Sequence, residues 1–455
     1  MVEAMTPGKI GPNNKERFIM KHIRQAIPLA LIFLVVFISH FISRNITSFD
    51  SAWSIHTAMS IIKEANTDLD EYREAENDRR IETVNGHLYT IFPIGASIIA
   101  IPFVYIMDKG IGPLLSIFPS LGKYIRSRSH HSLNAINVIT IYSGVELLVA
   151  SFIIALTTVF IYLLSSLYLN KMGSLLIAFI FAFCTSSWST ASRGLWQHGP
   201  TMMMLTIAIY LILLAKRKPR LIQFTGLTLA FAYVIRPTNS LPIFLLTVFV
   251  FLQYRKYFWR YLLWAALIIL PFLLYNVSIY HSLLSPYYLP GRIGSNTHFF
   301  EALGGNLLSP ARGLFFFTPI LLFSFYGIFL KIKHQQFEKI DCFLVGILFL
   351  HWICISSFPH WWAGWSFGPR FFSDMIPYLI YFLIPVVAEI SSTKEVRKAI
   401  FVFVFFCFIG ISFFIHYRGA NSWVTYLWNN EPVNVDNCIE RLWDWHDIQF
   451  LKGLW

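Results

Sequence analysis

Residues 26 to 43, AIPLALIFLVVFISHFIS, contain no Asp, Glu, Lys or Arg. A helix needs about 20 predominantly apolar residues to cross the hydrocarbon layer of a bilayer, and this stretch comes close to that length. A long basic segment, Lys9 to Arg24, precedes it, and no small-residue cleavage site follows it, which argues against a cleavable signal peptide. The sequence therefore predicts a first membrane-spanning helix that stays in place as an anchor.

Stretches of the same character recur along the chain. Of its 455 residues 56% are hydrophobic and only 13% are charged, which leaves too little polar surface to coat a water-soluble globule of this size. We expect an all-α polytopic membrane protein with about 10 to 12 transmembrane helices. The clearest later stretches are residues 89–107, 200–215, 261–280, 314–330, 343–355 and 400–415.

The charge distribution predicts which loops face the cytoplasm. A net charge of +12 would suggest a nucleic-acid partner in a soluble protein, but here most of the basic residues fall in short loops that hold few acids. The positive-inside rule assigns such loops to the cytoplasm, and we expect no nucleic-acid partner. The basic loops are residues 1–25, 108–137, 216–220, 254–260, 331–339 and 391–398. Residues 44–88 and 418–455 are more acidic than basic and are predicted to be extracytoplasmic.

One problem of parity remains between two of these loops. Three apolar segments lie between residues 108–137 and 216–220, and an odd number of crossings cannot join two loops on the same side. Either the segment 138–167 is broken near Gly144 and Glu146 into two short passes, or a weak segment at 112–121 enters the membrane. The sequence leaves both solutions open.

The chain is predicted to form one membrane domain. A basic cytoplasmic N-terminus (1–25) precedes a transmembrane domain (26–417), and an extracytoplasmic tail (418–455) follows it. The first outer loop, residues 44–88, is the most polar part of the protein. Within it, residues 49–65 (FDSAWSIHTAMSIIKEA) place apolar side chains on one helical face and Asp50, Ser54, Thr57 and Glu64 on another. This pattern predicts an amphipathic helix lying on the membrane surface.

Polar and aromatic clusters stand at the predicted outer ends of later helices. If the charge topology is right, they open to the same side as the acidic first loop, so functional groups converge on one face. The clusters are Arg193-Gly-Leu-Trp196-Gln-His198, Arg236-Pro-Thr-Asn, Ser285-Pro-Tyr287-Tyr, Ser309-Pro-Ala-Arg312-Gly and His360-Trp361-Trp362-Ala-Gly-Trp365-Ser-Phe-Gly-Pro-Arg370.

With Asp50 directly after the first helix and the run Gly86-His87-Leu88-Tyr89-Thr-Ile-Phe92-Pro93, these clusters resemble the GT-C class of membrane glycosyltransferases. The nearest branch contains the protein O-mannosyltransferases and aminoarabinose transferases. The resemblance implies inverting transfer of a sugar from a polyprenyl-phosphate donor to a hydroxyl of a glycan, lipid or protein. The reaction would occur on the extracytoplasmic face of the cell membrane, among its lipids, with an acidic residue of the first outer loop as base. The mannosyltransferases have an Asp-Glu pair where this chain has Asp50-Ser51, which leaves the acceptor class open.

The chemistry of such a donor fits a single carboxylate. A polyprenyl phosphate is already a good leaving group, so transfer needs a base for the acceptor hydroxyl but no general acid. Asp50, at the start of the predicted helix 49–65, is the predicted catalytic base. The alternative is that Asp50 only caps this helix, because Asp suits the unpaired amides of a first turn.

The remaining candidate residues would bind donor or acceptor. Asp68, Asp70 and Glu71 could hold Mg²⁺ or Mn²⁺ through an Asp-x-Asp motif, and the alternative is a solvated acidic loop. The four arginines Arg193, Arg236, Arg312 and Arg370 could bind the donor phosphate, with Arg312 and Arg370 favoured by neighbouring glycines, or could simply reach lipid headgroups. Trp361, Trp362 and Trp365 could stack on a sugar or belong to an interfacial aromatic belt. His87 and His198 could donate hydrogen bonds to substrate or could be ordinary interface histidines. Further candidates for binding donor or acceptor are Tyr89, Trp196, Tyr287 and His360.

A transporter or flippase of a lipid-linked or small polar substrate is the alternative function. Helices broken by Pro and Gly could also line a permeation path. Ion-coupled carriers usually have paired ionisable residues within the membrane, and here Glu146 is the clear exception in otherwise uncharged segments. The sequence therefore favours the glycosyltransferase.

Overall fold

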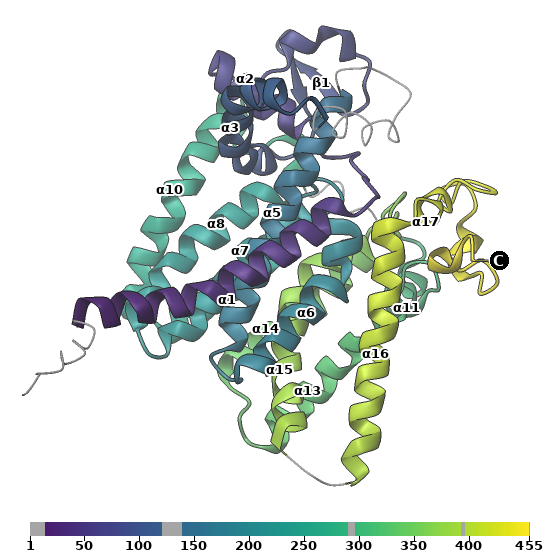
Figure 1. The fold of residues 1–455 in the computed structure, drawn as a ribbon. Coiled ribbons are helices and arrows are strands. Elements are labelled where there is room, and N and C mark those ends of the chain that lie inside the picture. The colour runs from purple at the N-terminus through teal and green to yellow at the C-terminus, as the bar shows by residue number, and fades with distance from the viewer. Residues whose placement is uncertain (1–13, 121–138, 290–295, 393–395, 455) are drawn as a thin grey trace, which may run out of the picture.

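The computed structural model describes residues 14–120, 139–289, 296–392 and 396–454, which are mostly helical (Figure 1). Much of the predicted cytoplasmic N-terminus, most of the 108–137 loop and part of the 391–398 loop lie outside these ranges. The helices are α1 (Asn14–Ile42), α2 (Ser54–Glu64), α3 (Gly95–Ile117), α5 (Ile139–Ser165), α6 (Lys171–Phe183), α7 (His198–Ala215), α8 (Thr225–Ile235), α9 (Ser240–Gln253), α10 (Arg255–Tyr280), α11 (Phe299–Leu308), α12 (Leu314–Phe317), α13 (Phe323–Lys333), α14 (Lys339–Ser356), α15 (Ile376–Ser392), α16 (Val396–Asn421) and α17 (Val424–Leu427), and the strands are β1 (Ile81–Val84) and β2 (His87–Thr90).

Six helical segments in the described ranges are long and apolar enough to cross a membrane, so this is a polytopic membrane protein, as the composition predicted. Shorter apolar helices accompany them, among them α6 and the apolar part of α1. The six long segments are Ser143–Ser165 in α5, His198–Ala215, Arg255–Tyr280, Lys339–Ser356, Arg370–Ile390 at α15, and Ala399–Asn421 in α16.

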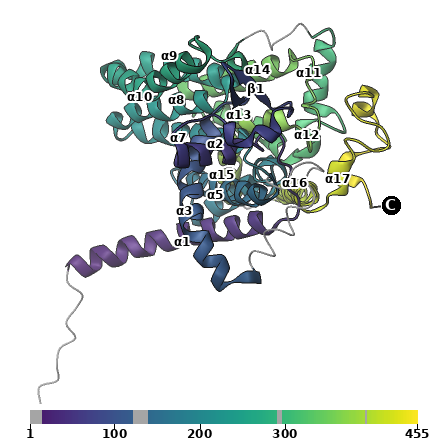
Figure 2. The same cartoon turned by 90° about the horizontal axis from the view of Figure 1, so that it is seen from above.

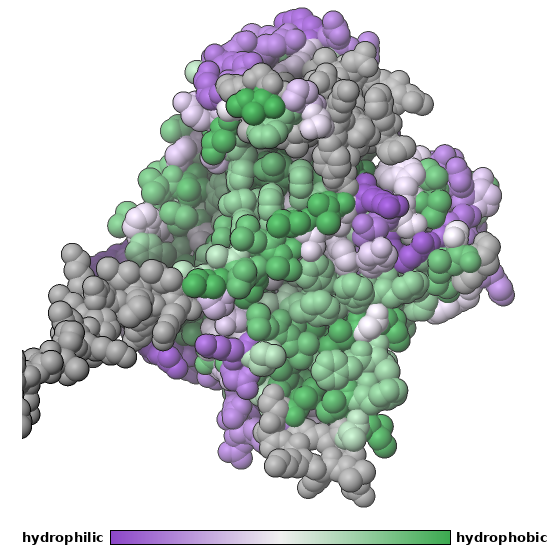
Figure 3. All heavy atoms as spheres, in the orientation of Figure 1, coloured by the Kyte–Doolittle hydropathy of each residue, from purple (hydrophilic) through white to green (hydrophobic). Residues whose placement is uncertain are grey.

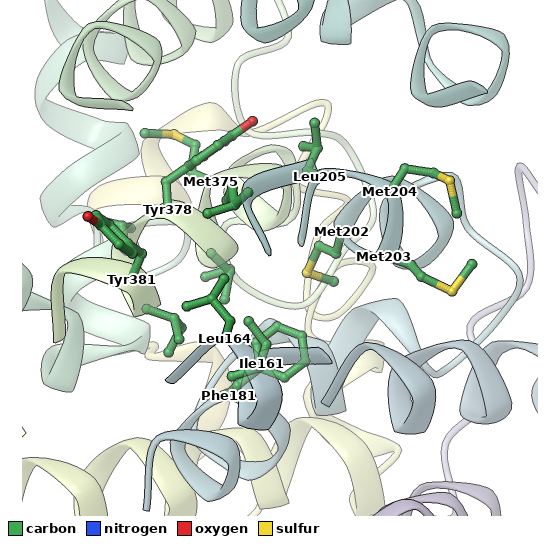
Figure 4. Close-up of a cluster of buried hydrophobic side chains, with 14 of the residues drawn as sticks. Ile161, Leu164, Phe181, Met202, Met203, Met204, Leu205, Met375, Tyr378 and Tyr381 are labelled. Carbon is green, nitrogen blue, oxygen red and sulfur yellow. The ribbon is translucent and has the colours of Figure 1, made fainter. Parts of the chain in front are cut away.

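The helices divide into an interior set and an outward-facing set. On α7 the run Met202 to Leu205 is buried and belongs to one core with residues of α5, α6 and α15 (Figure 4). On α10, by contrast, Leu263, Leu267, Leu270 and Leu274 are all more than half exposed, at a spacing that places them on one face. The surface around the middle of the molecule is correspondingly apolar, and polar residues gather at its ends (Figure 3). Lipid chains are the natural contact of such a face.

The predicted helix 314–330 is broken into three pieces. α12 ends at Phe317, a 3₁₀ turn spans Pro319–Leu322, and only then does α13 begin. Pro319 has no backbone N–H to donate within a helix, which explains the interruption.

The first outer loop ends in a β-hairpin. β1 and β2 pair antiparallel, with Val84 opposite His87, and the connecting Asn85 and Gly86 both have positive φ, at 52° and 85°. Asn-Gly is the preferred pair for such a two-residue turn. Within the Gly86 to Pro93 run, Gly86 therefore belongs to the turn and His87–Thr90 form the second strand of this loop.

The predicted amphipathic helix exists as α2, but it does not lie on a surface with its polar side in water. Ser54 and Thr57, both on the predicted polar face, are buried. The Thr57 hydroxyl donates to the backbone carbonyl of Trp53 at 3.0 Å, which satisfies it inside the protein. Protein therefore covers the N-terminal half of α2 on both faces, which a periodicity argument cannot detect.

One contact bears on the predicted assignment of sides. α3 packs against α2, and Lys63 Nζ at the end of α2 lies 3.5 Å from Asp108 Oδ1 of α3. The charge rule had placed residues 44–88 and residue 108 on opposite sides of the membrane, and here the two regions contact each other. α5 is one continuous helix, so the predicted break near Gly144 and Glu146 does not occur.

The C-terminal residues 422–454, called here the C-terminal segment, fold against the loop that contains Trp361 and Trp362. Trp428, Val435 and Leu442 share a small hydrophobic core with those two tryptophans. Seen from above, the segment lies at the opposite edge of the molecule from α9 and α10 (Figure 2). The predicted tail is thus a packed part of the protein.

Candidate functional site

Asp50 forms an ion pair with Arg370, with 3.0 Å between Asp50 Oδ2 and Arg370 Nη1. It does not cap a helix, because α2 begins at Ser54 and its N-cap residue is Trp53, without a side-chain cap. The alternative role that the sequence left open for Asp50 is therefore excluded. The Asp50 side chain is 31% exposed and the Arg370 side chain 11%, so the pair stands at the boundary between protein and open space.

Several contacts fix the position of Arg370. Its Nη2 donates to the backbone carbonyl of Ala363 at 3.1 Å, and its guanidinium lies 4.4 Å from the centre of the Trp196 ring. A cation over an indole face is electrostatically favourable. The buried Nε atom has no hydrogen-bond partner among the described residues, so this arginine keeps one donor free.

The loop before Arg370 has an unusual backbone. Ala363 and Gly364 have φ of 64° and 58°, and a residue other than glycine is rarely found there. Arginines hold this turn from two sides, because Gly364 O accepts from Arg312 Nη2 at 3.1 Å while Ala363 O accepts from Arg370. Such strain persists only when the surroundings enforce it, and here it presents two carbonyls to two guanidinium groups.

Arg312 is occupied by the protein itself. Its Nε donates to Trp362 O at 2.9 Å, and its Nη atoms donate to the Asn429 Oδ1 at 2.6 Å and to the Gln449 Oε1 at 3.0 Å, among others. It is 1% exposed and lies outside the cavities around Asp50. Burial lowers the pKa of Arg312 to about 9. The geometry makes Arg312 the anchor of the C-terminal segment and argues against the predicted contact with phosphate.

Arg193 is likewise a structural residue. It is fully buried and donates to the backbone carbonyls of His40 in the last turn of α1 and of Ser43 and Asn45 just after it. These contacts fix the direction in which the chain leaves the first helix toward Asp50.

Arg236 and His198 meet on a buried carboxylate that the sequence analysis missed. Arg236 Nη1 forms an ion pair with Asp374 Oδ2, and His198 Nδ1 lies 3.0 Å from Asp374 Oδ1. All three side chains are at most 5% exposed. Asp374 follows the Gly-Pro-Arg run in an otherwise apolar segment, and an acid in such a place could have been noticed.

Two cavities meet at the Asp50–Arg370 pair. Asp50, Arg370 and Trp196 line both of them. The small one has about 40 Å³ and is lined by polar groups that include Gln197, His198, Arg236 and Tyr287. The large one has about 670 Å³ and lies between the first outer loop, the Ala363–Trp365 turn and the C-terminal segment. Only the large cavity has room for a sugar.

The tryptophans of the 360–365 run have different surroundings. Trp361 is 2% exposed and lies against Gly305 so closely that a Cβ there would meet its ring at 2.3 Å. Trp362 is also buried, with exposed His360 beside its ring. Only Trp365, 39% exposed, lines the large cavity. Trp361 and Trp362 are core residues and do not line the large cavity. Of the three tryptophans, Trp365 is therefore the one that could stack on a sugar there.

In the acidic stretch 68–71, Asp70 stabilises the β-hairpin. Asp70 Oδ2 lies 2.7 Å from His87 Nδ1, and Asp70 Oδ1 accepts from the Leu88 amide at 3.0 Å. Although partial burial raises it, these two contacts and Arg73 hold the pKa of Asp70 below its usual range. Asp68, Asp70 and His87 do come within 4.8 Å of one another, but His87, Arg73 and the amide already use the Asp70 oxygens. Exposed Glu71 and half-buried Tyr89 lie outside both cavities.

The structure adds residues that the sequence did not single out. Glu146 accepts the Leu195 amide at 3.0 Å and so helps to position Trp196. Trp423, Tyr426 and Asp436 of the C-terminal segment line the large cavity. No protein-family model and no curated protein matches this chain.

Proposed function

We propose that the protein is an inverting membrane glycosyltransferase that moves a sugar from a polyprenyl-phosphate donor to an acceptor hydroxyl on the extracytoplasmic face. The observation that carries the proposal is the Asp50–Arg370 pair, which lines both cavities. A base for the hydroxyl and a cation for the leaving phosphate are the two groups that this reaction needs. The Asp50–Arg370 pair supplies both groups side by side where the two cavities meet, and the Asp50 side chain is partly exposed there.

In the proposed mechanism Asp50 takes the proton from the acceptor hydroxyl as that oxygen attacks the anomeric carbon. The bond between this carbon and the phosphate oxygen breaks on the opposite face, which inverts the configuration. Arg370 stabilises the phosphate that leaves. The Arg370 guanidinium is paired with Asp50 in the structure, so a bound phosphate would compete for it and release the carboxylate. Donor binding would thus prepare the base.

An apolar groove offers a place for the lipid tail. It has about 310 Å³ and lies between α3, α8 and α10, lined by residues such as Ile94, Ile98 and Leu267. The chain just before Ile94 lines the small cavity through Phe92 and Pro93, so groove and cavity lie on either side of one segment. An isoprenoid chain in the groove would keep its hydrocarbon out of water while its phosphate reached Arg370.

The test is Asp50→Asn in the purified full-length protein, with Glu71→Gln as the matched control. Glu71 is an exposed acid of the same loop outside both cavities. Loss of a general base typically costs a factor of about 100 to 10,000 in rate. We expect this loss of transfer in Asp50→Asn, with donor binding unchanged or tighter because the competitor for Arg370 is gone. Near-normal transfer from a polyprenyl-phosphate sugar would refute the proposal.

A further inference from the structure

We infer that the large cavity binds a neutral carbohydrate acceptor and that the C-terminal segment supplies one wall of the binding surface. The inference rests on the proposed function, because it names the acceptor for the same Asp50. The lining of the cavity comes from distant parts of the chain, which are the stretch Ile46–Asp50, Arg79, Trp196, the Ala363–Trp365 turn, Arg370 and residues 423–436.

Size and aromatic lining both suit a sugar. A volume of about 670 Å³ falls in the range of about 300 to 1,000 Å³ that ligand pockets usually have. Trp365 and Trp423 are both solvent-accessible, and the Trp423 ring stacks on Tyr426 with 4.8 Å between centroids. Indole and phenol rings combine an apolar face with a polar tip, which is the surface that a pyranose ring requires.

The polar groups in the same lining suit hydroxyls. Asp436 Oδ1 accepts from Trp362 Nε1 at 2.8 Å, while no ion pair to the Asp436 carboxylate is found within the described ranges. Asn434 lies two residues earlier and accepts from Trp365 Nε1 at 3.1 Å, which leaves its amide NH₂ to donate. Burial raises the pKa of Tyr426 to about 12, so its hydroxyl stays a donor. The lining of the large cavity thus contains both hydrogen-bond donors and hydrogen-bond acceptors.

The charges in the cavity balance. Asp50 and Arg370 neutralise each other, and Arg79 and Asp436 are one cation and one anion. An acidic glycan would meet two carboxylates without a surplus of positive charge. A neutral polyol can use all four groups through hydrogen bonds, and its hydroxyl can approach Asp50 where the cavity narrows.

The C-terminal wall is held firmly enough to recognise a ligand. Trp428 and Val435 are fully buried, and Asn429 accepts from Arg312 at 2.6 Å. A surface that is already ordered loses little entropy when it binds a ligand.

The experiment measures binding of the purified protein in nanodiscs to immobilised probes. The probes are neutral trisaccharides of glucose, mannose, galactose and N-acetylglucosamine, a uronic-acid trisaccharide and a Ser/Thr-rich peptide. We expect binding to at least one neutral trisaccharide, weakened about tenfold in Trp365→Ala and in Asp436→Asn. Trp445→Ala is the matched control, because Trp445 is a 53% exposed tryptophan of the same C-terminal segment that lies outside the cavity.

Binding only to the peptide or the acidic trisaccharide would overturn the inference, as would neutral binding that Trp365→Ala and Asp436→Asn leave unchanged. The two proposals fail separately. Loss of transfer in Asp50→Asn without any neutral trisaccharide binding would refute the acceptor assignment and keep the glycosyltransferase. In the opposite case, trisaccharide binding depends on Trp365 while transfer does not depend on Asp50. That result would keep the carbohydrate site and refute the proposed glycosyltransferase mechanism.

Discussion

The role of an arginine in this protein depends on where its five N–H groups point. Arg193 and Arg312 donate to carbonyls and amides inside the fold, and Arg236 is paired with Asp374. Arg370 alone among the four outer arginines joins Asp50 at a cavity. The sequence could identify all four as candidates, because each stands at a predicted helix end. It favoured Arg312 and Arg370 for their neighbouring glycines, but it could not separate these two, because their partners are up to 320 residues away in the chain.

Arg370→Lys should reduce transfer with little effect on folding. Lysine keeps the charge but not the planar fork, so it cannot hold Asp50 and Ala363 together while lying flat on Trp196. We expect kcat to fall on the order of 100-fold. The thermal unfolding midpoint in detergent should stay close to that of the wild type. A variant with wild-type kcat would remove Arg370 from the mechanism.

Arg312→Ala should have the opposite profile. Removing this side chain leaves buried acceptors on Trp362, Asn429 and Gln449 without their donor, which costs about 3 kcal/mol in free energy of unfolding. The unfolding midpoint should fall, and proteases should cleave the C-terminal segment more readily. Unchanged stability together with weaker donor binding would return Arg312 to the site.

At the scale of elements, the sequence predicted those that depend on a long apolar stretch, such as α7, α10 and α16. The Asn85-Gly86 turn was not predicted, although Asn-Gly is a preferred pair for a two-residue turn. The buried polar side of α2 could not be predicted, because tertiary packing decides which faces of an amphipathic helix are covered. The C-terminal segment was assigned as a tail from its charge, which says nothing of the packing of Trp428, Val435 and Leu442.

The packing of α2 leads to a dependence on pH. Burial of His56 beside Trp53 and Tyr72, together with the charge of Arg80, lowers the pKa of His56 to about 4, although the Ala52 carbonyl opposes this. The ordinary pKa of a histidine is 6.5, so between pH 6.5 and about 4 the unfolded loop binds a proton that the folded loop does not.

Stability of the first outer loop should therefore fall as the pH falls through this window, by up to about 3 kcal/mol, and level off below it. Hydrogen exchange of α2 amides measured from pH 7 to pH 4, corrected for the intrinsic rate, would detect the change. His56→Gln should remove the dependence on pH. An equal dependence in the variant would assign the effect to another group.

At the scale of the whole molecule, the contact between Lys63 and Asp108 leads to a prediction about topology. It spans 3.5 Å, whereas the hydrocarbon layer is about 30 Å thick. We therefore expect residue 109 on the same side as the first outer loop. The three helices α5, α6 and α7 would then lead from that side to residues 216–220 on the other, and an odd number of crossings would solve the parity problem.

This topology predicts that residue 109 is extracytoplasmic, against the positive-inside rule. Single cysteines at Glu76, Lys109 and Lys218, in a background without the native cysteines, would be tested with a membrane-impermeant maleimide on intact cells. We expect labelling at 76 and 109, and labelling at 218 only after the membrane is opened. The rule counts basic residues near the ends of crossing helices, and on this prediction α3 does not cross. Labelling of 109 together with 218 would mean that α3 spans the bilayer and that the Lys63–Asp108 contact does not form. The first outer loop would then lack the helix against which α2 packs, and with it the support that holds Asp50 at Arg370.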